Sequence, residues 1–585
     1  METNANQVYD GFLTLERGVD SGKTPSSLQR NQTSFAVNAT FRGGEPSCRP
    51  GWIKRELVFN DANGANDTSL VSAFEDGLFQ GAAFYDAQEG ESSLVCATGG
   101  RLYRISVTNG YRVIDITPSE AGSTRITKWW FCQAEEFLIC QDGQMKPIIF
   151  DGGFTRRVTK DTEIPVGKAM AYAGGRLWVT LPDETSFIAG DLVYSSSGSP
   201  EYEYRDAVLN ITENDYLNEG GAFGMPGNSG GIKALVPTNN LDTSLGQGPL
   251  LAVTPNLIAS VQAPIDRTAW KNLEYPIQTI ALNGFGGLSD RSAVTVNGDV
   301  FYRSEDGIRS FRMARRDFGQ WGNTPISSEM NRVLPHDSRH MLEYSSAVIF
   351  DNRFLSTVSP YWVQGHGVAH RGLAVLDFDI LSRMYGAQQP AWEGVWTGVN
   401  VLQLITGRFG GQERCFAFVL NGSNQIELWE LSRDYPFDYG EGGDTRIEWS
   451  VEMKAFDFDS PFNQKQLEYG EIWVDDVVGK VNFSAEWRPD GYPKWLQWHS
   501  GWNEEATRTQ TMASLLGSQA TPRNQYRSKM RLPYPDYQSD AVSDTDLRNF
   551  FTLQPRLQVI GHCKLKHFRV AARHVTEFGR GAYRT

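Results

Sequence analysis

LVCATGGRLYRIS, residues 94–106, shows the pattern from which the fold is predicted. Apolar-alternating segments flank Gly99-Gly100, and this dipeptide supplies the positive backbone torsions of a tight hairpin turn. Five further segments repeat the plan: FLICQDGQMKPIIFDGG (137–153), MAYAGGRLWVTLP (170–182), VFYRSEDGIRSFR (300–312), VIFDNRFLSTVSP (348–360) and FAFVLNGSNQIELWELS (416–432). Imperfect copies of one hairpin predict radially arranged sheets, as in an irregular β-propeller. A long β-sandwich or a β-helix is the alternative.

The pattern changes near residue 445, where longer alternating strands begin with RIEWSVEMKAFDF and GKVNFSAEWRPD. We therefore predict an all-β chain with an irregular β-propeller followed by a C-terminal β-sandwich. The expected boundaries are 1–52 for an N-terminal strap, 53–440 for the propeller and 441–585 for the sandwich. The Gly/Asn-rich segment 214–249 is predicted as a long loop or blade connection, and 503–530 as an extended loop.

The formal charge of −14 argues against a nucleic-acid binder with a basic face. The charge is uneven, because residues 506–585 hold 13 basic and 5 acidic side chains, a balance of +8. The remaining 505 residues hold 42 basic and 64 acidic side chains, a balance of −22. This asymmetry is typical of an interaction segment, and basic outer positions of a C-terminal sheet would explain it equally well.

The cysteines show no CxxC pair and no zinc spacing, which favours buried free thiols: Cys48, Cys96, Cys132, Cys140, Cys415 and Cys563. The first fifty residues contain no apolar run long enough for a signal sequence or a membrane helix. We expect assembly in a reducing cytoplasm, and neither a metal nor a cofactor.

Three motifs have residue types found in catalytic or metal sites. GNSGG (227–231) is similar to the segment around a trypsin-like nucleophile, but no histidine stands in a matching context for Ser229. A flexible glycine loop is therefore favoured. His336/His340 and His366/His370 have metal-ligand spacing for a helix, but the surrounding Pro, Gly and Asp argue against a helix.

Carboxylates and tryptophans raise the question of a sugar-acting propeller. The pairs Asp377/Asp379 and Asp457/Asp459 are interpreted as solvated strand faces rather than acid/base pairs. The segment 304–307 departs from the sialidase Asp box by a glycine placed one position early. Four tryptophans crowd into WRPDGYPKWLQWHSGW, and core or interface packing is favoured over sugar stacking: Trp487, Trp495, Trp498 and Trp502.

The N-terminal fifty residues carry the most specific spacing in the chain. Its positions are Gly18-Val19-Asp20, Pro25, Leu28, Gln32, Asn38, Gly43-Gly44 and Arg49-Pro50-Gly51. This spacing resembles the opening of phage tail proteins that carry a β-propeller. Further similar stretches are GDVFYRSEDGIRSFR (298–312) with Pro325-Ile326-Ser327-Ser328, YAGGRLWV with LVYSSSGSPEYEY (192–204), and WRPDGYPKW (487–495).

The family that the chain resembles is the tail nozzle or tail-hub protein of short-tailed phages. The resemblance implies a virion protein in a ring, typically six-fold, below a tail adaptor, with DNA passing through its centre. It implies no catalytic residues and no cofactor. Two alternatives stay open: a propeller that degrades glycans, and a lectin-like receptor-binding protein of the tail tip.

Two predictions join these residues to function. Residues 10–52 are expected to form a packed strap whose course is fixed by Gly18, Asn38 and Arg49-Pro50-Gly51, with Gly51 at positive φ. A disordered arm is the alternative. If DNA passes through a ring, its lumen should present Asp and Glu so that phosphates do not bind. Three arginines of the basic C-terminal segment should instead contact acidic neighbours: Arg569, Arg573 and Arg580.

Overall fold

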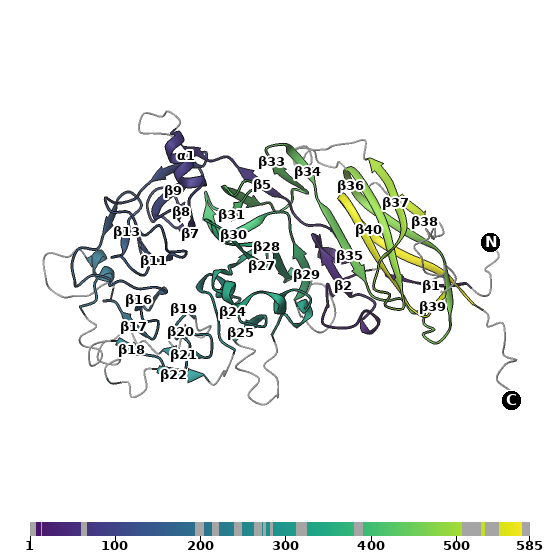
Figure 1. Cartoon of the computed structure of the whole chain (residues 1–585), viewed down its shortest axis with the longest axis horizontal. Coiled ribbons are helices and arrows are strands. Elements are labelled where there is room, and N and C mark those ends of the chain that lie inside the picture. Colours follow the sequence, from purple (N-terminus) through teal and green to yellow (C-terminus); the bar gives the residue numbers. More distant parts are fainter. Residues whose placement is uncertain are drawn as a thin grey trace.

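The computed structural model describes residues 7–12, 14–59, 67–192, 204–212, 222–238, 248–261, 272, 277–280, 285–311, 325–379, 390–505, 528–532 and 549–575. A β-propeller and a β-sandwich lie side by side (Figure 1), so the predicted all-β fold class is confirmed. One short helix, α1 (Thr68–Glu75), precedes the second strand of the first blade. Within the described residues, no helix has the length and apolarity needed to cross a membrane.

The described part of the propeller has seven blades of three to five strands each. Blade 1 consists of β6 (Val58–Phe59), β7 (Phe79–Tyr85), β8 (Ser93–Thr98), β9 (Arg101–Ser106) and β10 (Arg112–Asp115). Blade 2 consists of β11 (Trp130–Ala134), β12 (Phe137–Gln141), β13 (Ile148–Phe150) and β14 (Thr155–Arg157). Blade 3 consists of β15 (Met170–Ala173), β16 (Arg176–Thr180), β17 (Ser186–Ala189) and β18 (Ala222–Gly224). Blades 4 and 5 are β19 (Ala234–Pro237), β20 (Leu250–Val253), β21 (Ile258–Val261) and β22 (Ile277–Ile280), and β23 (Val294–Val296), β24 (Asp299–Arg303) and β25 (Ile308–Ser310). Blade 6 is β26 (Ala347–Phe350), β27 (Arg353–Val363), β28 (Gly367–Asp377) and β29 (Ala391–Trp396), and blade 7 is β30 (Asn400–Phe409), β31 (Gln412–Leu420), β32 (Ile426–Leu431) and β5 (Trp52–Arg55).

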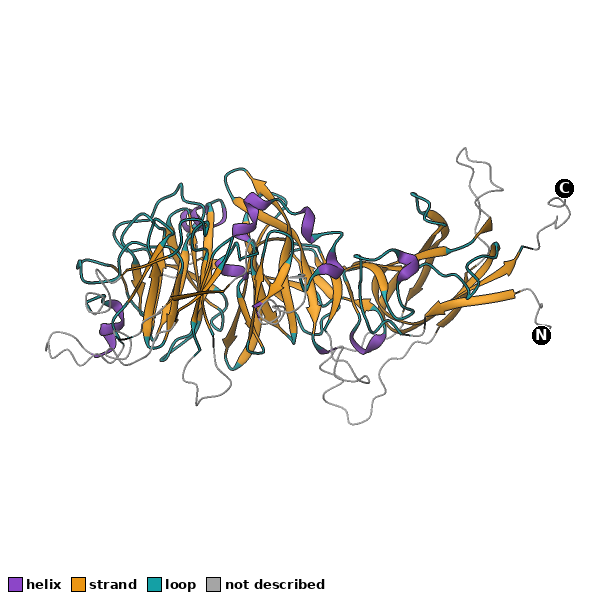
Figure 2. Ribbon diagram, turned by 90° about the horizontal axis from the view of Figure 1, so that it is seen from below, coloured by secondary structure: helices purple, strands orange, loops and turns teal. Residues whose placement is uncertain are grey.

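The blades are seen edge-on in Figure 2, where the sandwich extends from one side of the disc. Short 3₁₀ turns occupy connections: η1 (Pro25–Ser27), η2 (Arg42–Gly44), η3 (Tyr204–Leu209), η5 (Asp290–Ser292), η7 (Ser328–Met330), η8 (Leu334–His336) and η9 (Arg339–Tyr344).

The propeller is closed by a strand from near the N-terminus. The innermost strands face one another around the axis, and β30 of blade 7 contacts β7 of blade 1. β5 is the outer strand of blade 7 and pairs antiparallel with β32, from Leu428 opposite Arg55 to Leu431 opposite Trp52. The last blade therefore combines two segments that lie far apart in the sequence.

The hairpin turns have the backbone torsions that the dipeptides predict. Both residues have positive φ at Gly99-Gly100 (57° and 81°), Gly174-Gly175 (64° and 70°) and Asp351-Asn352 (50° and 57°). The loop predicted over 214–249 is wrong in part, because β18 and the inner strand β19 of blade 4 lie within it. β19 is a four-residue ALVP strand in a Gly/Asn-rich context, and its partner β20 begins only at Leu250.

The sandwich is built on two long antiparallel strands, β36 (Lys465–Pro489) and β40 (Leu553–His574). Their register breaks between Asp475 and Asn482, and Gly561 near this point has a φ of 110°. Each strand thus contributes one half to each of two layers. One layer adds β1 (Gln7–Phe12), β38 (Ser528–Leu532) and β39 (Asn549–Phe550), and the other adds β2 (Thr33–Val37), β35 (Glu448–Met453) and β37 (Leu496–Glu505). The predicted loop over 503–530 falls mostly on residues 506–527, which lie outside the described residues.

β2 joins the two domains. It pairs antiparallel with β35 of the sandwich, and Val37 pairs in parallel with Val395 of β29 in blade 6. His370 of β28 also pairs with Val401 of β30, so blades 6 and 7 and the sandwich belong to one 18-stranded sheet. Two short hairpins lie beside this junction, formed by β3 (Ala39–Thr40) with β4 (Ser47–Cys48) and by β33 (Phe437–Gly440) with β34 (Gly443–Arg446).

Candidate functional site

Residues 7–55 run from the sandwich to the propeller, and Gly18 lies at the first contact with blade 6. It has a φ of 60°, and a Cβ atom here would lie 2.3 Å from the carbonyl oxygen of Trp392 in β29. The same carbonyl accepts a hydrogen bond from the amide of Val19 at 2.8 Å. Gly18 is therefore required both by its torsion and by the close approach of two backbones.

Asn38 connects both domains to the N-terminal segment. Its φ is 53°, in the left-handed region that asparagine tolerates. Its Nδ2 donates to the hydroxyl of Thr397 at 3.0 Å and to the carbonyl of Glu448 at 2.9 Å. Its Oδ1 accepts from the amide of Thr397 at 2.6 Å and from Nε of Arg49 at 3.1 Å. One amide side chain thus contacts blade 6, the sandwich and the following turn.

Arg49 forms a buried bidentate ion pair with Asp438 in β33. The two N–O distances are both 2.8 Å, and Arg49 is only 1% exposed. The guanidinium also donates to the carbonyl of Thr397 at 2.7 Å, and Asp438 accepts from the amide of Trp52 at 2.8 Å. A planar guanidinium can make these bonds at once, whereas a lysine ammonium cannot reproduce the fork.

Gly51 does not have a positive φ, contrary to the prediction made for it. A Cβ atom here would lie 1.7 Å from the carbonyl oxygen of Phe437. The amide of Gly51 donates to the carbonyl of Tyr435 at 2.6 Å. Glycine is needed after Pro50 because two backbones approach each other, rather than because the turn demands an unusual torsion.

An ionic cluster holds Arg42, between Asn38 and Arg49 in the segment, against blade 6. Arg42 contacts Asp351 and Asp377 at 2.7 Å each, and Arg353 contacts Asp351 at 2.6 Å, Asp377 at 3.2 Å and Glu393 at 3.1 Å. Burial raises the pKa of Glu393 to about 7, although the charge of Arg353 opposes this shift. The cluster satisfies charges that would be unfavourable alone in the interior.

Cys48, His562 and Asp476 form a line between β4, β40 and β36. The sulfur of Cys48 lies 3.1 Å from Nδ1 of His562, and Nε2 of His562 lies 4.0 Å from Asp476. Burial would lower the pKa of His562, but its hydrogen-bonding and electrostatic interactions with Cys48 and Asp476 outweigh this effect and raise that pKa to about 9. Cys48 is 4% exposed, so these side chains tie the segment to the sandwich rather than receive a substrate. All six cysteines are free, and all but Cys132 are buried.

The C-terminal arginines are already paired within the sandwich. Arg569 donates from Nε to Glu471 at 3.0 Å, and Arg573 lies 3.8 Å from Glu468. Their side chains are 49% and 55% exposed. If a carboxylate of a neighbouring protein contacted these two arginines, as predicted, it would share them with Glu471 and Glu468. Arg580 lies outside the described residues.

The nucleophile and metal motifs do not assemble sites. The hydroxyl of Ser229 is buried and has no hydrogen-bond partner, so no base activates it. His336 lies in η8 and His340 in η9, while His366 precedes β28 and His370 lies within it. Across the described ranges, no group of three His, Cys, Asp or Glu side chains could hold a metal ion.

The interpretation of the two carboxylate pairs as solvated strand faces is wrong. Asp377 is fully buried in the ionic cluster, and Asp379 follows the end of β28. Asp457 and Asp459 lie in the turn between β35 and β36, and Asp459 has a φ of 54°. Neither pair of carboxylates therefore lies on one face of a strand.

The tryptophans are mainly structural, as favoured from the sequence. Trp487 and Trp498 are buried in the sandwich core, where Trp498 lies 6.4 Å from the ring of Phe568. Trp495 lies between two guanidinium groups, each 4.5 Å from its ring centroid. The side chain of Trp502 lies outside the described residues.

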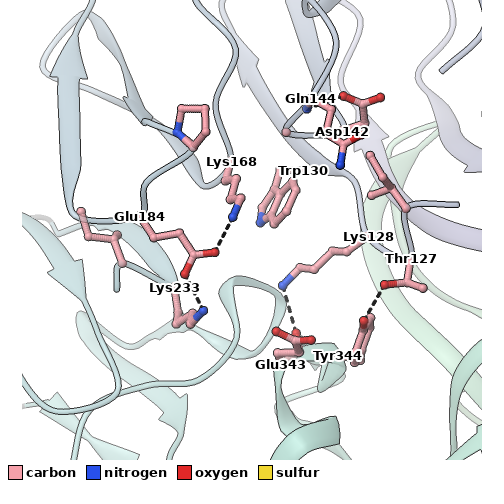
Figure 3. Close-up of a pocket in the computed structure, with 14 residues that line it drawn as sticks. Thr127, Lys128, Trp130, Asp142, Gln144, Lys168, Glu184, Lys233, Glu343 and Tyr344 are labelled. Carbon is pink, nitrogen blue, oxygen red and sulfur yellow. Dashed lines mark hydrogen bonds and ion pairs between the residues drawn. The ribbon is translucent and has the colours of Figure 1, made fainter. Parts of the chain in front are cut away.

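A polar pocket of about 340 Å³ opens on one face of the propeller (Figure 3). It is formed where connections arrive at the inner strands of blades 2, 3, 4 and 6. Lys128, Lys168 and Lys233 stand one or two residues before β11, β15 and β19. Glu184 bridges two of them, at 2.5 Å from Lys168 and 2.7 Å from Lys233. These two ammonium groups lower the pKa of Glu184 against the effect of its burial.

Beside this pocket, side chains join connections that come from opposite sides of the propeller ring. Lys128 contacts Asp290 at 2.6 Å and the carbonyl of Glu343 at 2.9 Å, and burial lowers the pKa of Lys128. Arg291, from the connection into blade 5, donates to the carbonyls of Gln80 at 2.7 Å and Trp129 at 3.1 Å. Blade 5 stands across the ring from blades 1 and 2, so this side chain spans the axis.

The sequence did not single out the pocket lysines. Their common feature is a lysine just before the first strand of three consecutive blades. That repeat becomes visible only when blade 4 is recognised, and its inner strand lies in the segment predicted as a loop.

No protein-family model matches the chain, and no curated protein matches it. Among solved structures, it is similar to the Cps50 (Swd1) β-propeller domain of Myceliophteria thermophila (12% identity, TM-score 0.35, 61% of this chain and 97% of that one). It is also similar to the extracellular domain of the putative hybrid two-component system BT4673 from B. thetaiotaomicron (12%, 0.34, 83% and 59%) and to BBS1N in complex with ARL6DN (12%, 0.34, 66% and 98%). Likenesses at this level carry no information about what this chain binds or does.

Proposed function

We propose that this chain is a structural subunit of a phage tail, several copies of which form a ring-shaped nozzle or hub segment through which DNA passes. The observation that carries the proposal is the strand β2 between blade 6 and the sandwich. Together with Asn38 and the Arg49–Asp438 pair, it fixes the sandwich to blade 6, and blades 6 and 7 share one sheet with the sandwich. A subunit that bears load in an assembly needs such a fixed relation between its domains.

Contacts across the ring bear on where DNA would pass in such an assembly. Arg291 and Lys128 span the propeller, so the genome would pass between copies of the chain rather than through one propeller. The expected lumen is acidic and drawn from the segment with the −22 balance, because phosphates would not be retained there. The expected partners are further copies of the chain, in a six-fold ring, and a tail adaptor, in a virion assembled in the host cytoplasm.

Electron microscopy of the purified chain tests the proposal. We expect rings with a central hole, and the same protein in a proteomic inventory of purified virions. A chain that stays monomeric in micrographs and is missing from virions would overturn the proposal and favour the glycan-binding alternative.

A further inference from the structure

The pocket in Figure 3 repeats one chemical feature around the propeller. Lys128, Lys168 and Lys233 come from three consecutive blades and point into the same hollow. Each stands where the chain enters an inner strand, so the propeller geometry itself brings the three lysines to one pocket. Trp130 lies between Lys128 and Lys168 and forms part of the wall.

The lining offers more hydrogen-bonding capacity than its internal contacts use. Lys168 and Lys233 each donate to Glu184, which uses one of three N–H groups on each ammonium. Their side chains are 25% exposed, so the remaining donors face the hollow. Glu343 and Tyr344 add a carboxylate and a phenol from the connection into blade 6.

The charges of the lining balance. The lining holds three lysines and three carboxylates, Asp142, Glu184 and Glu343, and Asp290 beside the pocket pairs with Lys128 at 2.6 Å, so the site carries no net positive charge. A balanced lining does not concentrate anions such as phosphates. A lining of charged donors and acceptors beside one indole also disfavours an apolar ligand. A ligand rich in hydroxyl groups fits both features, because each hydroxyl donates and accepts.

We propose that this pocket binds a neutral sugar residue, with its hydroxyl groups bonded to Lys168, Lys233 and Glu184 and its apolar ring face against Trp130. The volume of about 340 Å³ lies within the range of ligand pockets. This site goes beyond the proposed tail function and does not depend on ring formation. A failed ring experiment therefore leaves it intact.

Saturation-transfer NMR on the full chain tests the site. The probes are glucose, galactose, mannose and N-acetylglucosamine at about 1–10 mM, with glucuronic acid as the anionic comparison. We expect at least one neutral sugar to bind, with an affinity that changes less than about twofold with added salt. Glu184→Gln combined with Lys233→Met should weaken binding at least about tenfold, because hydrogen bonds to charged groups are lost.

Two further variants keep the result interpretable. Gln144→Trp places a bulky ring at an exposed lining position and should abolish binding with the fold intact. Lys146→Met removes an exposed lysine of the same propeller outside the pocket, and binding should be unchanged. The proposal is overturned if no neutral sugar binds, if only glucuronic acid binds with strong salt dependence, or if Gln144→Trp binds normally.

Discussion

Gly51 occupies a position where any side chain meets backbone. In Gly51→Ala, the new Cβ atom would lie 1.7 Å from the carbonyl oxygen of Phe437, and neither backbone can yield without disturbing β5 and β33. We expect the free energy of unfolding to fall by about 2–3 kcal/mol, as for other overpacked sites. Urea denaturation measures it. Gly442→Ala is the control, because nothing lies within 4 Å of its Cβ position, and an equal loss in both variants would refute the explanation.

His562 makes stability depend on pH. Its pKa in the folded chain is about 9, above the ordinary 6.5, because Cys48 and Asp476 outweigh its burial, while Lys564 also pairs with Asp476. Its contribution is therefore present below pH 6.5 and is lost as the pH rises through about 9. We expect a loss of at most about 3 kcal/mol over that interval.

The measurement is a denaturation series from pH 6 to pH 9.5 on the native chain and on His562→Gln. The difference between the two curves should shrink as the pH rises, since other titrating groups are common to both. Parallel curves would show that His562 does not carry the effect.

At the scale of elements, the N-terminal segment is held by its buried ion pair. Arg49→Met leaves Asp438 without its partner, and we expect a loss of about 3 kcal/mol. Arg49→Lys should recover only part of it, because the bidentate geometry is lost. Arg569→Met is the matched control, since its pair with Glu471 is on the surface and should contribute less than about 1 kcal/mol. Thermal unfolding of the three variants decides whether the segment depends on this pair.

Hairpins were predictable from sequence because their information is local. Gly174-Gly175 and the strands on either side lie within one short window, and the turn needs two positive torsions. Blade 4 was not recognised because β19 is short and its partner strand is not adjacent. The closing strand β5 was equally hidden, since nothing in Trp52–Arg55 identifies β32 as its partner.

For the N-terminal segment, the sequence identified the important residues but not the residues that they contact. The spacing pointed to Gly18, Asn38 and Arg49, yet the partner carbonyls and carboxylates lie hundreds of positions away. The reason given for Gly51 was wrong because close approach cannot be read from a single segment. The pocket lysines required the blades to be aligned first.

At the scale of the whole molecule, β2 should make the two domains unfold together. We expect one calorimetric transition for the native chain. Val37→Pro removes an amide from a strand with neighbours on both sides and should split unfolding into two transitions. Thr445→Pro, in an exposed hairpin strand, should leave one transition. Two transitions in the native chain would contradict the coupling.

The closing strand also imposes an order in time. β5 ends at Arg55 and its partner β32 begins at Ile426. A ribosome adding about 5–20 residues per second leaves β5 alone for roughly 20–75 s. Over that interval the nascent propeller is an open arc, and only a nearly complete polypeptide can close it. Prematurely terminated products would thus lack the last blade and keep the propeller open.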